Sequence, residues 1–133
     1  VTRRALSKLT WPGVWTNAFC GHPAPGEENT AAVLRRASFE LGIASSDLSA
    51  PRLNLPDFSY RAVDSSGTVE NEICPVYTVE LAPDAQWEPN PEEVDSYQWV
   101  EPARLFAAAD AMPGVFSPWM IDELADEKLR AAL

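Results

Sequence analysis

The sequence has few of the residues on which several protein classes depend. Its two cysteines, Cys20 and Cys74, are too few for a disulfide framework and have no zinc-finger spacing, so we expect a protein of the reducing cytoplasm. No run of about 18 apolar residues is present, and we therefore expect no membrane-spanning helix and no membrane partner.

Basic residues are scarce and unevenly placed. The formal net charge is −10, yet the first 36 residues hold five basic side chains against two acidic ones. The remainder holds five basic and eighteen acidic residues. The five early basic residues are Arg3, Arg4, Lys8, Arg35 and Arg36. This balance disfavours a nucleic-acid partner and suits a compact anionic ligand, and an uneven surface charge without a ligand is the alternative.

The length of the chain suits one domain. With 133 residues, 46% of them hydrophobic, residues 1–133 can bury a single core. Val1 is not a start methionine, and Val1-Thr2-Arg3-Arg4 reads like the end of a strand entered from upstream. We therefore expect the domain to be incomplete at its N-terminus.

Alternating apolar and polar residues predict strands over 58–63, 68–81 and 96–100. Asp64-Ser65-Ser66-Gly67 between the first two is typical of a hairpin turn. Residues 45–57 are expected to be a connection, and 83–93 a loop rich in proline and acid.

Helices are predicted over 30–41, from Pro102 to about 109, and from Ser117-Pro118 towards 133. Asn29 or Thr30 is expected to cap the first helix, and Gly42 to end it. Strands interleaved with helices predict a mixed α/β domain.

Two carboxylates lie on one face of the predicted strand 68–81. Glu70 and Glu72 are two residues apart, so their side chains lie about 6–7 Å apart on the same side. Buried together they repel and require a cation, an arginine or a shared proton. Because Thr78 and Glu80 continue the polar alternation, an ordinary solvated strand face is the alternative, and Cys74 is expected in the core.

A loop–helix motif begins at Gly21. It continues with Glu27, Arg35 and then Arg36-Ala37-Ser38-Phe39-Glu40-Leu41-Gly42-Ile43. This resembles the Nudix box, which holds divalent metal against a diphosphate. Arg36 and Phe39 stand where the hydrolase pattern has glutamates, so only Glu40 of these carboxylates is present. Arg36 and Glu40 are four residues apart and face the same side of a helix.

Further segments resemble type I isopentenyl-diphosphate isomerase, in order and over essentially the whole chain. They are Thr2-Arg3-Arg4-Ala5, Trp11-Pro12-Gly13-Val14-Trp15-Thr16-Asn17, Cys20-Gly21-His22-Pro23, Tyr60-Arg61-Ala62, Glu70-Asn71-Glu72 and Phe116-Ser117-Pro118-Trp119-Met120. The resemblance implies a Nudix-like mixed sheet sandwiched by helices and here missing its N-terminal strands. It also implies a role in isoprenoid biosynthesis, interconverting isopentenyl and dimethylallyl diphosphate.

The resemblance also implies roles for single residues. Cys20 and Glu72 are the acid/base pair that adds one proton to the alkene and removes another. Tyr60 would hydrogen-bond Glu72 and help to move its proton. Trp119 would present its ring face to the tertiary carbocation, an attraction of about 2 kcal/mol when desolvated.

Two metal sites and a diphosphate site follow from the same resemblance. His22, Glu70 and Glu72 are ligands of a Mn²⁺ (or Zn²⁺) site that takes five ligands in the family, two of them upstream histidines. Glu40 and the backbone carbonyl of Cys20 would hold Mg²⁺, which suits hard oxygen ligands. The diphosphate of an isoprenyl substrate would contact Arg4, Lys8 and Arg36.

Several alternatives remain open from the residues alone. The chain could be a Nudix-type diphosphate hydrolase, or an inactive remnant that binds diphosphate without turnover. Cys20 alone would be a small buried apolar residue, His22 a structural hydrogen-bonding residue, and Trp15, Tyr60 and Trp119 core aromatics. A monomer is expected.

Overall fold

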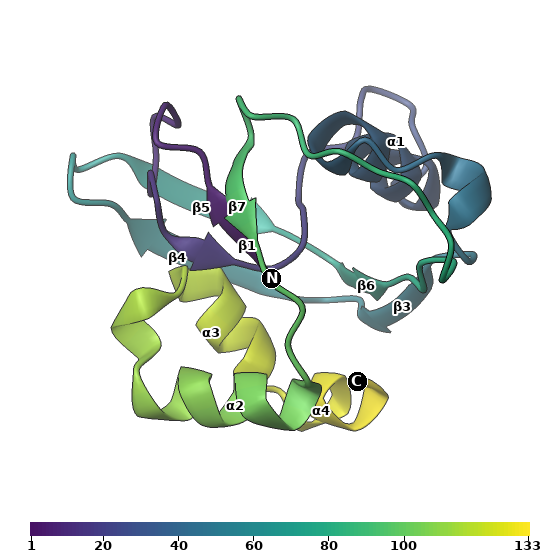
Figure 1. Cartoon of the computed structure of the whole chain (residues 1–133). Coiled ribbons are helices and arrows are strands. Elements are labelled where there is room, and N and C mark those ends of the chain that lie inside the picture. The colour runs from purple at the N-terminus through teal and green to yellow at the C-terminus, as the bar shows by residue number, and fades with distance from the viewer.

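The strands of the computed structural model, which describes residues 1–133, lie between two groups of helices (Figure 1). Helices α2 (Pro102–Ala111), α3 (Pro118–Ala125) and α4 (Glu127–Ala132) gather on one side, and α1 (Asn29–Leu41) lies on the other. Short 3-10 helices cover Ser45–Asp47 and Pro113–Val115. The predicted mixed α/β class is confirmed.

The strands form three small antiparallel groups. In the first, β1 (Thr2–Arg4) lies between β2 (Trp15–Thr16) and β7 (Val94–Tyr97). In the others, β3 (Arg52–Leu55) pairs with β6 (Val76–Thr78), and β4 (Ser59–Val63) pairs with β5 (Val69–Ile73). The pairing of β1 with β7 places the start of the chain beside residues 93–97.

The predicted hairpin between β4 and β5 is confirmed. The Asp64 carboxylate accepts hydrogen bonds from the backbone N–H groups of Ser66 and Thr68, and Gly67 takes the left-handed conformation with φ 87°. The resulting register sets Tyr60 opposite Glu72 and Ala62 opposite Glu70. Both glutamates therefore point to the same side of the hairpin as Tyr60.

The prediction of one strand over 68–81 is wrong. The chain leaves the ladder at Cys74-Pro75, because proline has no N–H to donate. After this break β6 pairs with β3, which lies in the segment predicted to be a connection. The last sheet strand also begins earlier than predicted, at Val94 instead of Ser96.

Helix α1 ends as predicted but starts differently. Glu28 is its N-cap and makes no side-chain cap hydrogen bond, so the predicted caps Asn29 and Thr30 are wrong. At the other end Gly42 has φ 67°, and its N–H donates to the Ser38 carbonyl. A Cβ at Gly42 would lie 2.4 Å from the Glu88 carbonyl oxygen, so both backbone conformation and space favour glycine.

The C-terminal segment forms two helices where one was predicted. Pro102 begins α2, and the Ser117 hydroxyl caps α3 by accepting from the Met120 N–H, as expected. Asp126 then leaves the helical conformation and caps α4 by accepting from the Lys128 N–H. An aspartate that caps a new helix competes with continuing the old one.

The main core lies between the C-terminal helices and the strands above them. Its buried members are Leu55, Ala109, Trp119, Met120, Leu124 and Leu129. Helix α3 packs on β4 through this cluster, which fixes Trp119 against the hairpin. No helix is long and apolar enough to span a membrane.

One carboxyl group is buried in this core region. Glu123 of α3 is 4% exposed, and burial, with a smaller contribution from Asp122, raises the pKa of its carboxyl to about 8. An unfolded glutamate titrates near 4.3. Between about pH 4 and pH 8 the unfolded chain loses this proton while the folded chain keeps it, so the group lowers stability as the pH rises.

We predict that Glu123→Gln raises the free energy of unfolding at pH 8 by roughly 1–3 kcal/mol, and that this gain fades towards pH 4. Urea unfolding at pH 4, 6 and 8 measures the difference. The exposed Glu92→Gln is the matched control, and it should change stability little at any of the three values. A gain for Glu123→Gln that does not grow with pH would contradict the prediction.

Candidate active site

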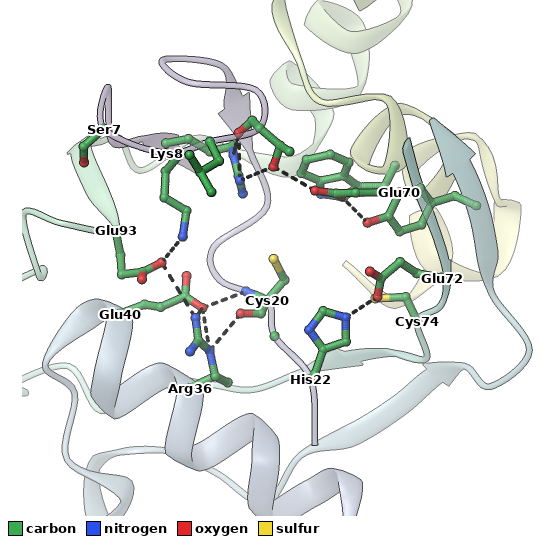
Figure 2. A pocket seen from close by; sticks show the side chains of 16 residues that line it. Ser7, Lys8, Cys20, His22, Arg36, Glu40, Glu70, Glu72, Cys74 and Glu93 are labelled. Atoms are coloured by element: carbon green, nitrogen blue, oxygen red, sulfur yellow. Dashed lines mark hydrogen bonds and ion pairs between the residues drawn. The ribbon is translucent and has the colours of Figure 1, made fainter. Parts of the chain in front are cut away.

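A cavity of about 420 Å³ gathers the residues singled out in the sequence (Figure 2). Its lining includes all ten of them: Arg4, Lys8, Cys20, His22, Arg36, Glu40, Tyr60, Glu70, Glu72 and Trp119. They come from β1 and the loop after it, the segment before α1, α1 itself, the β4–β5 hairpin and α3. Segments more than a hundred residues apart therefore meet at one place.

The cavity has two chemically different ends. Figure 2 shows Lys8, Arg36, Glu40 and Glu93 at one end, called the basic end below. His22, Glu70 and Glu72 lie at the other, called the acid/base end. The side chain of Cys20 projects into the cavity between them.

Arg36 ties the first end together. Its Nε donates to the Cys20 carbonyl and to Glu40 Oε1, both at 3.0 Å, and its Nη2 lies 2.7 Å from the same carboxylate oxygen. The N–H of Cys20 also donates to Glu40 Oε1, at 3.3 Å. A Cβ at Gly21 would lie 2.4 Å from Arg36 Nε, so glycine here lets the guanidinium reach the backbone.

A second arginine fixes the loop that carries Cys20 and His22. Arg35 binds both carboxylate oxygens of Glu27 at 2.8 Å and donates to the His22 carbonyl at 2.9 Å. The guanidinium holds the pKa of Glu27 down at about 2. Glu27 and Arg35 of the motif thus serve to anchor the loop on α1.

Glu93 was not singled out in the sequence, yet it lines the cavity. Its Oε2 lies 2.5 Å from Lys8 Nζ and 3.7 Å from Arg36 Nη2. In the sequence it is one of many acidic residues near a loop, and nothing local distinguishes it. Only the pairing of β1 with β7 brings it to the basic residues.

At the other end the two glutamates have different partners. His22 Nε2 lies 2.5 Å from Glu72 Oε2. Glu70 accepts hydrogen bonds from the Tyr60 hydroxyl at 2.9 Å and from the Thr10 hydroxyl at 2.8 Å. The expected bond from Tyr60 to Glu72 is therefore not formed, because the long tyrosine side chain reaches diagonally across the hairpin to Glu70.

Aromatic rings close the wall between the two ends. Trp119 is 3% exposed, with the ring centroids of Tyr60 and Trp11 at 5.5 and 5.1 Å. Arg4 lies 5.5 Å above its ring, and its indole N–H donates to Asn17 Oδ1 at 3.2 Å. Cys74, expected in the core, also lines the cavity, on the side that Glu70 and Glu72 share by strand alternation.

Burial favours the protonated form of several cavity groups. It raises the pKa of the Cys20 thiol to about 12, with the nearby Glu40 carboxylate adding to the effect. It also raises the pKa of Glu40, against the opposing pull of Arg36, and that of the Tyr60 hydroxyl, to which Glu70 contributes. At neutral pH Cys20 is a thiol that can give a proton.

The expected metal ligands are only partly gathered. No group of three or more His, Cys, Asp or Glu side chains is arranged to hold an ion. His22 and Glu72 face each other, but both oxygens of Glu70 are engaged by hydroxyls. Glu40 and the Cys20 carbonyl do converge as a pair of hard oxygens, and the Arg36 guanidinium bridges them.

Comparison with known proteins points to one family over most of the chain. Residues 1–120 match the NUDIX domain family. Isopentenyl-diphosphate Delta-isomerases from Corynebacterium glutamicum (strain R) and Corynebacterium diphtheriae are 54% and 56% identical over all 133 residues, which cover 70% and 72% of those proteins. The isomerase from an Escherichia coli strain is 50% identical, with 70% of its length covered.

A solved structure gives the same fold. The crystal structure of a Deinococcus radiodurans protein superposes with a TM-score of 0.65 at 25% identity, covering 93% of this chain and 70% of that one. Together these likenesses extend over most or all of the chain. The chain belongs to the isopentenyl-diphosphate Delta-isomerase family of NUDIX-domain proteins.

Proposed function

We propose that this chain interconverts isopentenyl and dimethylallyl diphosphate by adding a proton to the alkene and removing a different one. The observation that carries the proposal is the single cavity with a basic end and an acid/base end. A diphosphate at the first end leaves a short alkenyl chain to extend past Cys20 towards Glu72. The family membership supports the same reaction.

Arg4, Lys8 and Arg36 are the groups proposed to bind the diphosphate. A guanidinium can give two parallel hydrogen bonds to phosphate oxygens, and an ammonium acts as a compact positive charge. Lys8 and Arg36 are both engaged by carboxylates in the structure, whereas Arg4 donates to the Thr10 carbonyl and hydroxyl oxygens. The diphosphate would exchange with these internal partners.

Cys20 and Glu72 are the proposed acid/base pair. A proton moves from one of them to the terminal alkene carbon, which leaves a tertiary carbocation at the branched carbon. The other group takes a proton from the methylene carbon next to the cation on the diphosphate side, and the double bond forms there. Because burial keeps the Cys20 thiol protonated, the sulfur can serve as the donor. Water must be kept from the cation, and Trp119 and Tyr60 supply an apolar, electron-rich wall for this.

Isomerases of this family and Nudix enzymes in general use divalent metals. In this chain Glu40 and the Cys20 carbonyl offer two hard oxygens suited to Mg²⁺, provided that Arg36 turns from them towards the diphosphate. His22 and Glu72, with Glu70 after release from its hydroxyl partners, would hold the Mn²⁺ (or Zn²⁺) ion. When bound by these residues, the metals would supply positive charge against the diphosphate and would adjust the acidity of the Glu72 carboxyl.

We predict that Cys20→Ser and Glu72→Gln each lower the rate of isopentenyl diphosphate isomerisation by about 100-fold or more, because each removes one proton-transfer group. Proton NMR in the presence of Mg²⁺ and Mn²⁺ follows the appearance of dimethylallyl diphosphate. Cys74→Ser is the matched control and should stay within about threefold of the unmodified chain. Full activity in either of the first two variants would remove the assigned mechanism.

Phosphate release from diphosphate substrates distinguishes an isomerase from a hydrolase. We expect no phosphate release from isopentenyl diphosphate or from nucleoside diphosphate derivatives, since Arg36 and Phe39 stand where the hydrolase pattern has glutamates. A colorimetric phosphate assay measures it. Release at a rate above that of isomerisation would favour the hydrolase, and calorimetric binding of isopentenyl diphosphate without turnover would favour a binding protein.

We predict that the Cys20 thiol reacts slowly with iodoacetamide at neutral pH. Only the thiolate is alkylated, and with a pKa of about 12 the thiolate is rare at pH 8. In a Cys74→Ser background the rate constant at pH 8 should be at least about 100-fold below that of free cysteine. It should rise tenfold per pH unit from 7 to 10, whereas a plateau near pH 8–9 would show an ordinary thiol.

A further inference from the structure

Glu93 stands at the basic end of the cavity on a rigid backbone. Its carbonyl accepts from the Ala5 N–H at 2.9 Å, and its own N–H donates to the Asn90 carbonyl at 3.0 Å. The Asn90 N–H in turn donates to the Glu40 carbonyl at 2.9 Å. Glu93 is thus tied through its backbone both to β1 and to α1, the elements that carry the basic residues.

Its carboxylate engages the cations proposed to bind phosphate. One oxygen, Oε2, is 2.5 Å from Lys8 Nζ and 3.7 Å from Arg36 Nη2. All three side chains are mostly shielded from solvent, with exposed fractions of 15% for Glu93, 26% for Lys8 and 21% for Arg36. An anion at this point therefore meets less screening than a surface ion pair would.

Carboxyl side chains outnumber basic side chains in the cavity lining. The lining carries three basic side chains, Arg4, Lys8 and Arg36. Against these stand four carboxyl side chains, Glu40, Glu70, Glu72 and Glu93. Of the four, Glu93 is the one whose oxygen lies between Lys8 and Arg36, where a phosphate oxygen would have to bind.

We propose that Glu93 is a built-in competitor for the diphosphate: its carboxylate holds Lys8 and faces Arg36, and a phosphate ligand must displace it. The inference deepens the proposed function and rests on its diphosphate site. It makes Glu93 a determinant of affinity, since only a ligand with enough negative charge to outcompete a tethered carboxylate is retained. Glu93 touches the binding cations and none of the proton-transfer groups.

If Glu93 helped the ligand to bind, removing its charge would lower the affinity for the ligand. If Glu93 served to hold Lys8 and Arg36 in position for the ligand, its removal would loosen them and weaken binding. A purely structural role would lower stability and leave affinity unchanged or reduced. Tighter binding after removal of the charge contradicts both of these roles, and a gain that depends on Lys8 separates competition for the cation from loss of simple repulsion.

The test is calorimetric titration of inorganic pyrophosphate into the full chain and its Glu93→Gln variant, in buffer with EDTA. Glutamine keeps the size of the side chain and removes its charge. We expect the dissociation constant of the variant to be about tenfold lower or better. In the double variant Lys8→Met/Glu93→Gln most of this gain should disappear, because the released cation is absent.

Asp95→Asn is the matched control. Asp95 lies in β7, two residues after Glu93, and pairs with Arg3 at 3.1 Å, outside the cavity lining, so its removal changes the net charge equally. It should alter pyrophosphate affinity less than twofold. Equal or weaker binding by Glu93→Gln, beside clear binding by the unmodified chain, overturns the competition alone. Absence of binding by both proteins, with Mg²⁺ present as well as with EDTA, overturns the diphosphate site as well.

Discussion

A single guanidinium organises the site on which the proposed chemistry depends. Arg36 of α1 reaches across Gly21 to the Cys20 carbonyl and also holds Glu40, one helical turn further along. The segment carrying Cys20 and His22 has no strand partner of its own, so its position relative to α1 depends on this contact and on the Arg35–Glu27 pair. Two consecutive arginines, Arg35 and Arg36, thus hold an irregular loop in place as one wall of the cavity. Charged hydrogen bonds in a partly buried setting are strong enough for this purpose.

The opposite wall is built on a different principle. The β4–β5 hairpin places Tyr60, Glu70 and Glu72 on one side by backbone register, and α3 fixes the hairpin by packing against β4. The acid/base end therefore depends on strand pairing and apolar packing, and the basic end on ion pairs. Salt and pH act on the two ends differently, since screening weakens ion pairs and leaves apolar packing nearly unchanged.

Local patterns predicted the parts of the fold whose causes are local. The Asp64–Gly67 turn, the Gly42 helix end and the Ser117 cap each depend on a few neighbouring residues, and all were found as expected. The strand β3, the break at Cys74-Pro75 and the start of α4 at Asp126 were missed because alternation and apolar content outweighed one proline or one aspartate. Ten cavity residues were identified because a family's motifs name them together. Glu93 and the Tyr60–Glu70 hydrogen bond could not be identified from the sequence, since both arise from pairings across the fold.

Trp119 contributes both to the main core and to the cavity wall. It is a buried member of the main core, beside Leu55, Met120 and Leu124, and its ring is also part of the cavity wall under Arg4. A substitution of Trp119 therefore changes the cavity wall and disturbs the folding of the C-terminal half together. A smaller side chain that widened the pocket for a bulkier alkene would leave a void in the interior and reduce stability at the same time. At Trp119 a change of substrate range therefore also changes thermal stability. New specificity is more readily acquired at the polar residues that line the cavity.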